Sequence, residues 1–231
     1  MPPSDNECFS ALRLLQLADS ALPVGALSHS FGLEALVFDK DIEDQAGRSP
    51  TELAWYLEDA LSESLLVDAV FCREAHARAS RGARTGDLNR QLSALRLARE
   101  SREASLTMGR RFAALAAALH PCAELNGLAG EQELHHSVAF GYALGVLAIE
   151  AEVAVGAFLH QCVVNTISAG QRLLPLGQIQ ANRIAWDLKP AILEAVRHSR
   201  SISFSAVSSF AHLPELASMR HPCLPTRLFV S

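Results

Sequence analysis

The chain has 231 residues, a formal net charge of −5, and 49% hydrophobic against 19% charged residues. A chain of this length can bury enough apolar surface to form a core without disulfides or metals. Lys and Arg together number 20 against 25 Asp and Glu, with no basic block, which argues against nucleic acid as a ligand.

The start of the chain carries Asp5 and Glu7 where a signal or transit peptide would carry basic residues, so we expect a cytoplasmic protein. The five cysteines are far apart and none is in a C-x-x-C pair, which favours free thiols. The stretch 143–174 is apolar enough to resemble a membrane span. It is interrupted by Glu150, Glu152, His160, Gln161, Asn165 and Arg172, so we expect core helices and no membrane.

Apolar residues recur at helical spacing along almost the whole chain, and no run alternates over strand length. This pattern predicts an all-α fold, with one domain of about ten helices over residues 1–231. The first helix begins near Cys8. The ends of the chain, residues 1–10 and 216–231, are treated as tails, and the second of them looks weakly ordered by itself.

Residues 21–34 place a proline, two glycines, two serines and a histidine in an otherwise apolar run. The backbone preferences of these residues by themselves predict a turn between two helices. Pro23 would break the first helix and Gly25 would supply a permissive backbone. Ser28 would cap the helix that carries residues 31–34.

A clear helix start lies at Ser49-Pro50-Thr51-Glu52, where Ser49 can cap, Pro50 fits the first position and Glu52 completes a capping box. The buried stripe of this helix is predicted to be Leu53, Leu57, Ala60, Leu61 and Leu65.

A break over residues 81–86 precedes Asp87, the predicted N-cap of a helix whose apolar residues are Leu88, Leu92 and Leu95. The next helix is predicted from Arg102 to Leu119, with Met108, Phe112, Leu115 and Leu119 facing inward. Residues 122–132 follow as a predicted loop.

Gly141 and Gly145 lie one helical turn apart in an apolar stretch, which predicts a close approach between two helix backbones. Pro175 and Pro190 divide the remainder into a long helix ending near Leu174 and two shorter helices. The serine-rich stretch 199–209 shows no clear period.

The sequence contains no phosphate-binding loop, no zinc-protease helix and no nucleophile elbow, so it offers no positive case for catalysis. Adjacent helical residues point about 100° apart, so His135-His136 indicates a polar helix start or loop rather than a metal site. Cys72 and His76 share a helix face, for which packing is the better interpretation. The carboxylates Glu124, Glu131 and Glu133 are assigned to a solvated loop. We therefore expect no metal and no cofactor.

Five stretches, taken in order and counting the two C-terminal pieces as one, closely resemble the UreF urease accessory family. They are residues 14–34, Ser101-Arg102-Glu103 with Met108-Gly109-Arg110-Arg111, Ala139-Phe140-Gly141, Arg172-Leu173-Leu174-Pro175-Leu176-Gly177-Gln178, Ala217-Ser218-Met219-Arg220-His221, and Thr226-Arg227-Leu228-Phe229. The likeness covers almost the whole chain.

The resemblance implies an all-helical, homodimeric protein without catalysis of its own. It would bind the UreD accessory protein, also called UreH, recruit the GTPase UreG, and dock on apo-urease for nickel insertion. Both chain ends would order on UreD. The partner-binding residues implied are Pro23, Gly25, Ser28, His29, Gly32, Glu34, Arg102, Met108, Arg110, Arg172, Gln178, Met219, Arg220, His221 and Arg227.

Arg227 is the strongest of these candidates, since its guanidinium can donate several hydrogen bonds in a partly desolvated interface. Arg110 or Arg111 is a candidate arginine finger for the GTPase, against the simpler interpretation of a charged helix face. Two further hypotheses remain open. One is direct nickel carriage by His29, His221 and Cys223. The other is an unrelated helical hydrolase.

Overall fold

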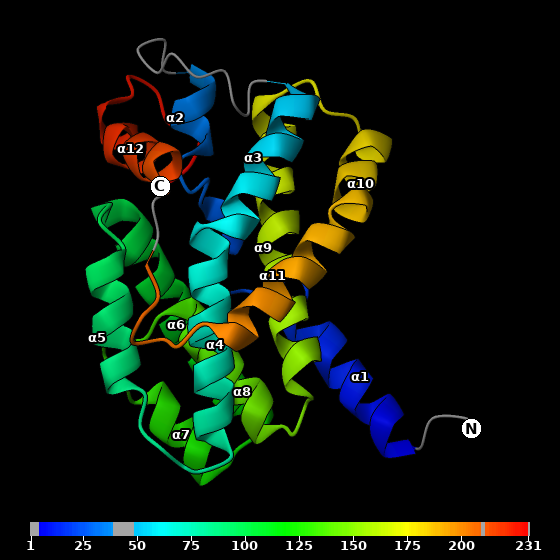
Figure 1. Cartoon of the computed structure of the whole chain (residues 1–231), viewed down its shortest axis with the longest axis vertical. Helices are drawn as coiled ribbons and strands as arrows, with labels where there is room; N and C mark the ends of the chain where they lie inside the picture. The colour runs from blue at the N-terminus through cyan, green and yellow to red at the C-terminus, as the bar shows by residue number, and fades with distance from the viewer. Residues whose placement is uncertain (1–4, 39–48, 209–210, 231) are drawn as a thin grey trace.

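The computed structural model describes residues 5–38, 49–208 and 211–230 (Figure 1). In these residues the chain forms twelve α-helices and two short 3-10 helices, with no strand, which confirms the all-α prediction. The helices are α1 (Asp5–Leu17), α2 (Leu33–Phe38), α3 (Pro50–Ser62), α4 (Ser64–Ala79), α5 (Gly86–Leu95), α6 (Arg99–Leu119), α7 (Ala123–Ala129), α8 (His136–Val146), α9 (Ala151–Leu173), α10 (Gln178–Asp187), α11 (Lys189–Ser201) and α12 (His212–Arg220), with η1 (Ala26–Ser28) and η2 (His221–Cys223).

Helix α8 packs against α4 and α6, and its residues 136–144 are all buried. Two glycines make this packing possible. A Cβ atom on Gly141 would lie 2.0 Å from the carbonyl oxygen of Cys72, and one on Gly145 would lie 2.6 Å from that of His76. The predicted close backbone approach is therefore confirmed.

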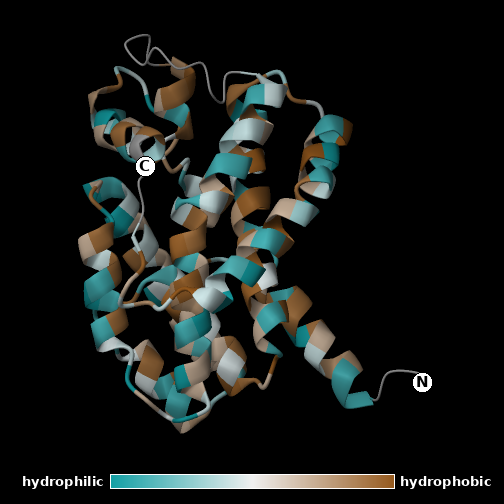
Figure 2. Ribbon diagram, in the orientation of Figure 1, coloured by the Kyte–Doolittle hydropathy of each residue, from teal (hydrophilic) through white to brown (hydrophobic). Residues whose placement is uncertain are grey.

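Helix α9 is long and apolar enough to cross a membrane, judged by length and composition only, but 56% of its most apolar window is buried inside the fold. Phe158, Leu159 and Val163 on this helix belong to the core. The outer helices show hydrophobic and hydrophilic residues interleaved along their ribbons (Figure 2), as expected for helices with one buried face. We interpret α9 as a core helix.

The predicted start of α3 is confirmed, because the Ser49 hydroxyl accepts a hydrogen bond from the backbone N–H of Glu52 at 3.2 Å. Glu52 Oε2 is buried without a hydrogen-bond partner, so this oxygen does not complete the capping box. The predicted stripe is correct except for Leu65. Helix α3 ends at Ser62, so Leu65 belongs to α4, where it is half-buried.

Two predictions in the middle of the chain are wrong. Asp87 is not an N-cap: Thr85 holds that position, and Asp87 in the first turn of α5 pairs with Arg78 instead. Residues 122–132 are not all loop, because burial of Leu125 and Leu128 against the core stabilises the short helix α7.

The helix predicted from Arg102 to Leu119 is present as α6, which starts three residues earlier, at Arg99. Met108 and Phe112 are buried as expected, and Leu115 is half-buried. Leu119 was predicted to face inward but is 50% exposed, because the last turn of α6 carries it past the core.

His135 and His136 mark a helix start, as predicted, and the structure adds that both side chains are buried. The His135 ring lies between the hydroxyls of Ser93 and Ser105, at 2.9 and 3.0 Å. Burial, with the nearby Arg96 adding to it, lowers the pKa of His135 to about 3 and that of His136 to about 4.

The structure confirms the interpretation of Cys72 and His76 and corrects that of Glu131. Cys72 is fully buried and His76 Nε2 lies 2.7 Å from the carbonyl oxygen of Ile149, so the packing interpretation is confirmed. Glu131 does more than solvate a loop, since its carboxylate accepts hydrogen bonds from Thr85 and Asn89.

Candidate partner-binding site

The turn block, residues 21–34, adopts a compact arrangement that differs from the predicted one. Ser28 ends the 3-10 helix η1 instead of capping α2. Gly25 and Gly32 have φ of 87° and 90°, and Phe31 between them also has a positive φ of 50°. Since L residues rarely adopt this region, glycine suits both turns, and Phe31 is a strained position.

Gly32 sets the distance between the turn block and α12. A Cβ atom there would lie 2.9 Å from the carbonyl oxygen of Pro214 and 3.0 Å from Ser218 Oγ. Helices α2 and α12 consequently lie side by side at one end of the molecule (Figure 1). The block and the C-terminal helix thus form one unit.

Glu34 is the centre of this unit and its side chain is fully buried. Its carboxylate accepts hydrogen bonds from the backbone N–H groups of Leu228 at 2.6 Å and of Phe229 at 3.2 Å. The same carboxylate lies 2.8 Å from His221 Nε2. A buried carboxylate is stable only when it is paired and hydrogen-bonded, and here the C-terminal segment supplies all three partners.

His221 connects Glu34 to a second carboxylate. Its Nδ1 lies 2.8 Å from Glu100 Oε2, on the first turn of α6. Arg227 Nη1 lies 3.7 Å from the other oxygen of Glu100, and the Arg227 side chain is 45% exposed. Glu34, His221, Glu100 and Arg227 are called the Glu34 cluster below.

Backbone contacts extend this docking along the chain. The N–H of Val230 donates to the carbonyl oxygen of Ser28 at 2.9 Å. Arg172, at the end of α9, donates to the carbonyl oxygen of Leu27 at 3.0 Å, and its guanidinium lies 4.3 Å from the centre of the Phe229 ring. Phe229 itself is buried. The prediction that residues 216–231 are weakly ordered is therefore wrong for residues 216–230; Ser231 lies outside the described residues.

The sequence candidates fall into two groups. The unit just described contains Gly25, Ser28, His29, Gly32, Glu34, Arg172, Met219, Arg220, His221 and Arg227, with Pro23 exposed at its start. The other four candidates, Arg102, Met108, Arg110 and Gln178, take no part in the hydrogen bonds and ion pairs just described.

Those four have local roles. Met108 is buried in the core, and Arg102 donates to the carbonyl oxygen of Arg96 at 2.7 Å. Arg110 is exposed and donates to Gln132 and Thr107. Gln178 is exposed in the first turn of α10.

Arg111 approaches the turn block, unlike its neighbour Arg110. Its Nη1 would lie 2.5 Å from a Cβ atom built on Gly25. Burial, followed by the positive charge of Arg111, lowers the pKa of His29. Arg111 thus faces the same unit as the docked tail.

Two contributors to this unit were not among the sequence candidates, Glu100 and Phe229. Glu100 stands one residue before the stretch Ser101-Arg102-Glu103, but a carboxylate in a first helical turn has no individual signal. Phe229 belongs to the C-terminal stretch Thr226-Arg227-Leu228-Phe229, but the sequence predicted no role for it. Only the fold shows that its ring meets Arg172.

Among the described residues, no three His, Cys, Asp or Glu side chains are grouped so that they could hold a metal ion. Of the three residues in the nickel-carriage hypothesis, His221 and His29 contact other side chains and Cys223 is exposed. Both ring nitrogens of His221 face carboxylates, and Cys223 is exposed. The His29 ring contacts that of Phe31, with 5.9 Å between centres.

The fold and the site together define an all-helical protein whose C-terminal segment docks on the turn block through a buried carboxylate. The family model of UreF matches residues 47–189. The chain is 35% identical over 229 residues to a urease accessory protein UreF of a Nostoc species, covering 95% of each chain. It is 33% identical over 225 residues to that of Paenarthrobacter aurescens, covering 95% of this chain and 97% of the relative.

A urease accessory protein UreF of a Bacillus species is also similar, at 31% identity over 225 residues. The family model matches more than half of the chain, and these relatives match it over nearly its full length. The chain belongs to the UreF family.

Proposed function

We propose that this protein is a non-enzymatic scaffold for urease maturation, which bridges UreD/UreH and the GTPase UreG and acts on apo-urease during nickel insertion. The observation that carries the proposal is the C-terminal segment docked on the turn block through Glu34. That docking builds a surface from two distant parts of the chain. Such a surface exists only in the folded protein and suits recognition of a specific partner.

The composition of this surface supports a protein interface. The exposed hydrophobic side chains at this end include Leu27, Leu216, Met219, Leu228 and Val230, each between 45% and 67% exposed. Arg172 and Arg227 lie beside them. Apolar anchors with arginines at their edge are the pattern of binding hot spots.

The N-terminal helix offers a second contact. Helix α1 projects from the body of the molecule (Figure 1) and buries only Leu17, while Phe9, Leu12 and Leu15 are between 53% and 68% exposed. A helix of 13 residues with so few contacts is marginal in water. This supports partner binding by the predicted N-terminal tail, residues 1–10, of which residues 1–4 lie outside the described residues.

The test is binding to UreD, measured by size-exclusion chromatography with light scattering and by titration. Arg227→Ala should weaken binding about 30-fold or more, since loss of an interface anchor costs about 2 kcal/mol. Arg183→Ala is the matched control, because Arg183 is exposed on α10. Equal affinity of both variants would show that Arg227 is not an anchor of the interface.

Light scattering of the protein alone also tests the proposed homodimer, which should give twice the mass of one 24.9 kDa chain. The GTPase role has its own test. The rate of GTP hydrolysis by UreG should change when this protein and UreD are added, and an unchanged rate would remove the regulatory part. We expect a cytoplasmic location and no cofactor.

A nickel titration of the isolated protein separates the scaffold from the metal carrier. The scaffold should bind nickel no better than weakly, since His221 is held between Glu34 and Glu100. Tight binding that disappears in a Cys223→Ser variant would support carriage instead.

A further inference from the structure

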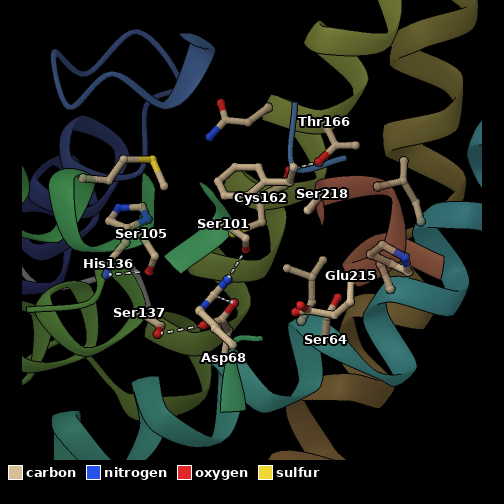
Figure 3. Close-up of a pocket in the computed structure, with 18 of the residues that line it drawn as sticks. Ser64, Asp68, Ser101, Ser105, His136, Ser137, Cys162, Thr166, Glu215 and Ser218 are labelled. Atoms are coloured by element: carbon tan, nitrogen blue, oxygen red, sulfur yellow. Dashed lines mark hydrogen bonds and ion pairs between the residues drawn. The ribbon is translucent and has the colours of Figure 1, made fainter. Parts of the chain in front are cut away.

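The helix that leads into the C-terminal segment, α12, meets the start of α6 beside a cavity of about 100 Å³ (Figure 3). Ser101 of α6 and Ser218 of α12 both line this cavity, whereas Glu100 and His221 do not. A cavity removes packing contacts between the segments that line it. Polar contacts between α6 and the C-terminal segment therefore carry more of the attachment here.

Glu100 makes two of these polar contacts. Its Oε2 lies 2.8 Å from His221 Nδ1, and its Oε1 lies 3.7 Å from Arg227 Nη1. The Glu100 side chain is 20% exposed and the His221 side chain is fully buried. Glu100 therefore connects the first turn of α6 to two residues of the C-terminal segment that are six positions apart.

The contacts of His221 determine how many protons its ring carries. A carboxylate oxygen lies 2.8 Å from each ring nitrogen, that of Glu34 from Nε2 and that of Glu100 from Nδ1. A neutral imidazole has one N–H donor and one acceptor, so it can donate to only one carboxylate. Both oxygens of Glu34 already accept a backbone N–H, from Leu228 and Phe229, so neither is placed to carry a proton itself.

Arg227 supplies a positive charge beside Glu100, which suits a carboxylate there rather than a carboxyl group. With two carboxylates as acceptors, the His221 ring has to donate from both nitrogens and is positively charged. Both nitrogens are then occupied, which leaves none for a metal ion. The charged ring is thus part of what holds the segment in place.

We propose that Glu100 is a positioning residue for partner binding, which acts through a charged His221 and presents Arg227 to the partner. The contact of Arg227 with Glu100 is longer than a hydrogen bond, and the Arg227 side chain is 45% exposed. Its guanidinium therefore keeps donors for a carbonyl or carboxylate of the partner. A side chain that is already held near its bound position loses less entropy on binding. The inference rests on the proposed function, because it concerns the segment proposed to bind UreD.

Docking of the segment should consequently depend on a proton. The charged groups in contact with His221 are Glu34 of α2 and Glu100 of α6, and Arg227 lies on the far side of Glu100. A neutral ring would turn a lone pair towards one carboxylate, which is repulsive. A histidine in a mobile chain loses its proton near about pH 6.5, so above that pH the released segment binds one proton fewer than the docked segment. Each further pH unit should shift the equilibrium towards release by up to about tenfold.

The first measurement needs no variant. Nitrogen NMR of the full chain distinguishes a histidine ring with two N–H groups from a ring with one bare nitrogen. At about pH 7 we expect both ring nitrogens of His221 to be protonated, although a mobile histidine would be mostly neutral there. A bare nitrogen on the His221 ring would overturn the proposal.

Glu100→Gln is the decisive variant, because it keeps the shape of the side chain and removes its charge. The new amide can donate to Nδ1 of a neutral ring while Nε2 still donates to Glu34, so the segment can dock without the extra proton. Docking is measured as protection of the Leu228 and Phe229 amides from hydrogen exchange, after division by the intrinsic rate at each pH. Between about pH 6.5 and 8.5 this protection should fall about tenfold or more in the parent and less than about twofold in Glu100→Gln.

Glu103→Gln is the matched control on the same helix. Glu103 is 57% exposed and pairs with Arg99, so this variant should keep the pH dependence of the parent. Protection that is independent of pH in the parent, or that falls equally in Glu100→Gln, would overturn the role of the charged ring.

Binding to UreD tests the positioning of Arg227. At about pH 6.5, where the segment is docked in both proteins, Glu100→Gln should bind UreD about fivefold more weakly than the parent. In the Arg227→Ala background the same substitution should have no further effect, since the side chain that it positions is gone. Additive losses of affinity would overturn the positioning role. If no form of the protein binds UreD, the proposed function fails and the positioning role fails with it, whereas the exchange data on the isolated chain still decide whether docking depends on the proton.

Discussion

Glu34→Ala tests how the C-terminal segment is held on the turn block. The substitution removes one buried carboxylate that accepts from Leu228 N, Phe229 N and His221 Nε2. Each buried donor left unpaired costs about 1–3 kcal/mol. Because the Leu228 N–H is only partly buried, the sum is about 3–5 kcal/mol, a large part of the 5–15 kcal/mol that is typical of a whole domain.

The protein can avoid part of this loss by releasing the segment. We therefore expect two linked changes in Glu34→Ala: a lower free energy of unfolding in urea, and faster hydrogen exchange at the Leu228 and Phe229 amides. Trypsin should cleave after Arg220 and Arg227 more quickly than in the parent. Circular dichroism should change little at the start of the titration, because the helices around α8 do not use these contacts.

Two control variants sharpen the experiment. Glu34→Gln keeps one acceptor, so its effect should be about half as large. Glu103→Ala removes a carboxylate of α6 that is 57% exposed and pairs with Arg99, so it should leave the tail protected. Unchanged stability and protected tail amides in Glu34→Ala would refute this account of the docking.

Gly141→Ala should destabilise the protein by about 3 kcal/mol or more in urea, because the new Cβ would lie 2.0 Å from a backbone oxygen of α4. Gly127→Ala in α7 should stabilise it by about 0.5–1 kcal/mol, since nothing lies within 4 Å of that Cβ; equal effects would contradict the packing described. His135 and His136 have folded pKa values lowered to about 3 and about 4. Below about pH 6.5 the histidines of the unfolded chain bind protons that those of the folded chain do not. The free energy of unfolding should therefore fall between about pH 6.5 and 4, by up to about 1.4 kcal/mol per pH unit for each histidine. His136→Phe should flatten that slope in urea titrations at several pH values, and an unaltered slope would exclude His136 as its source.

The sequence identified features that depend on near neighbours in the chain. Helical periodicity indicates all-α structure because each helix places its apolar residues on one face. The sequence predicted the start of α3 at Ser49, because a serine hydroxyl can accept a hydrogen bond from the backbone N–H three residues later and so cap the helix. Gly141 and Gly145 indicated close packing because only a missing side chain permits it, although not which helix approaches.

Three features depended on contacts between distant segments. Helix α7 and the burial of His135 and His136 follow from packing against the core, for which polar residues give no local signal. The docking of the tail joins Glu34 to residues 194 and 195 positions later.

The family resemblance named Glu34, His221 and Arg227 as separate candidates, but not the network that connects them through Glu100. The sequence by itself determined the helical class, most helix positions and the family. Only the tertiary structure decided which polar groups share a buried site, because the energy of a buried carboxylate depends on its partners in space rather than on its neighbours in the chain.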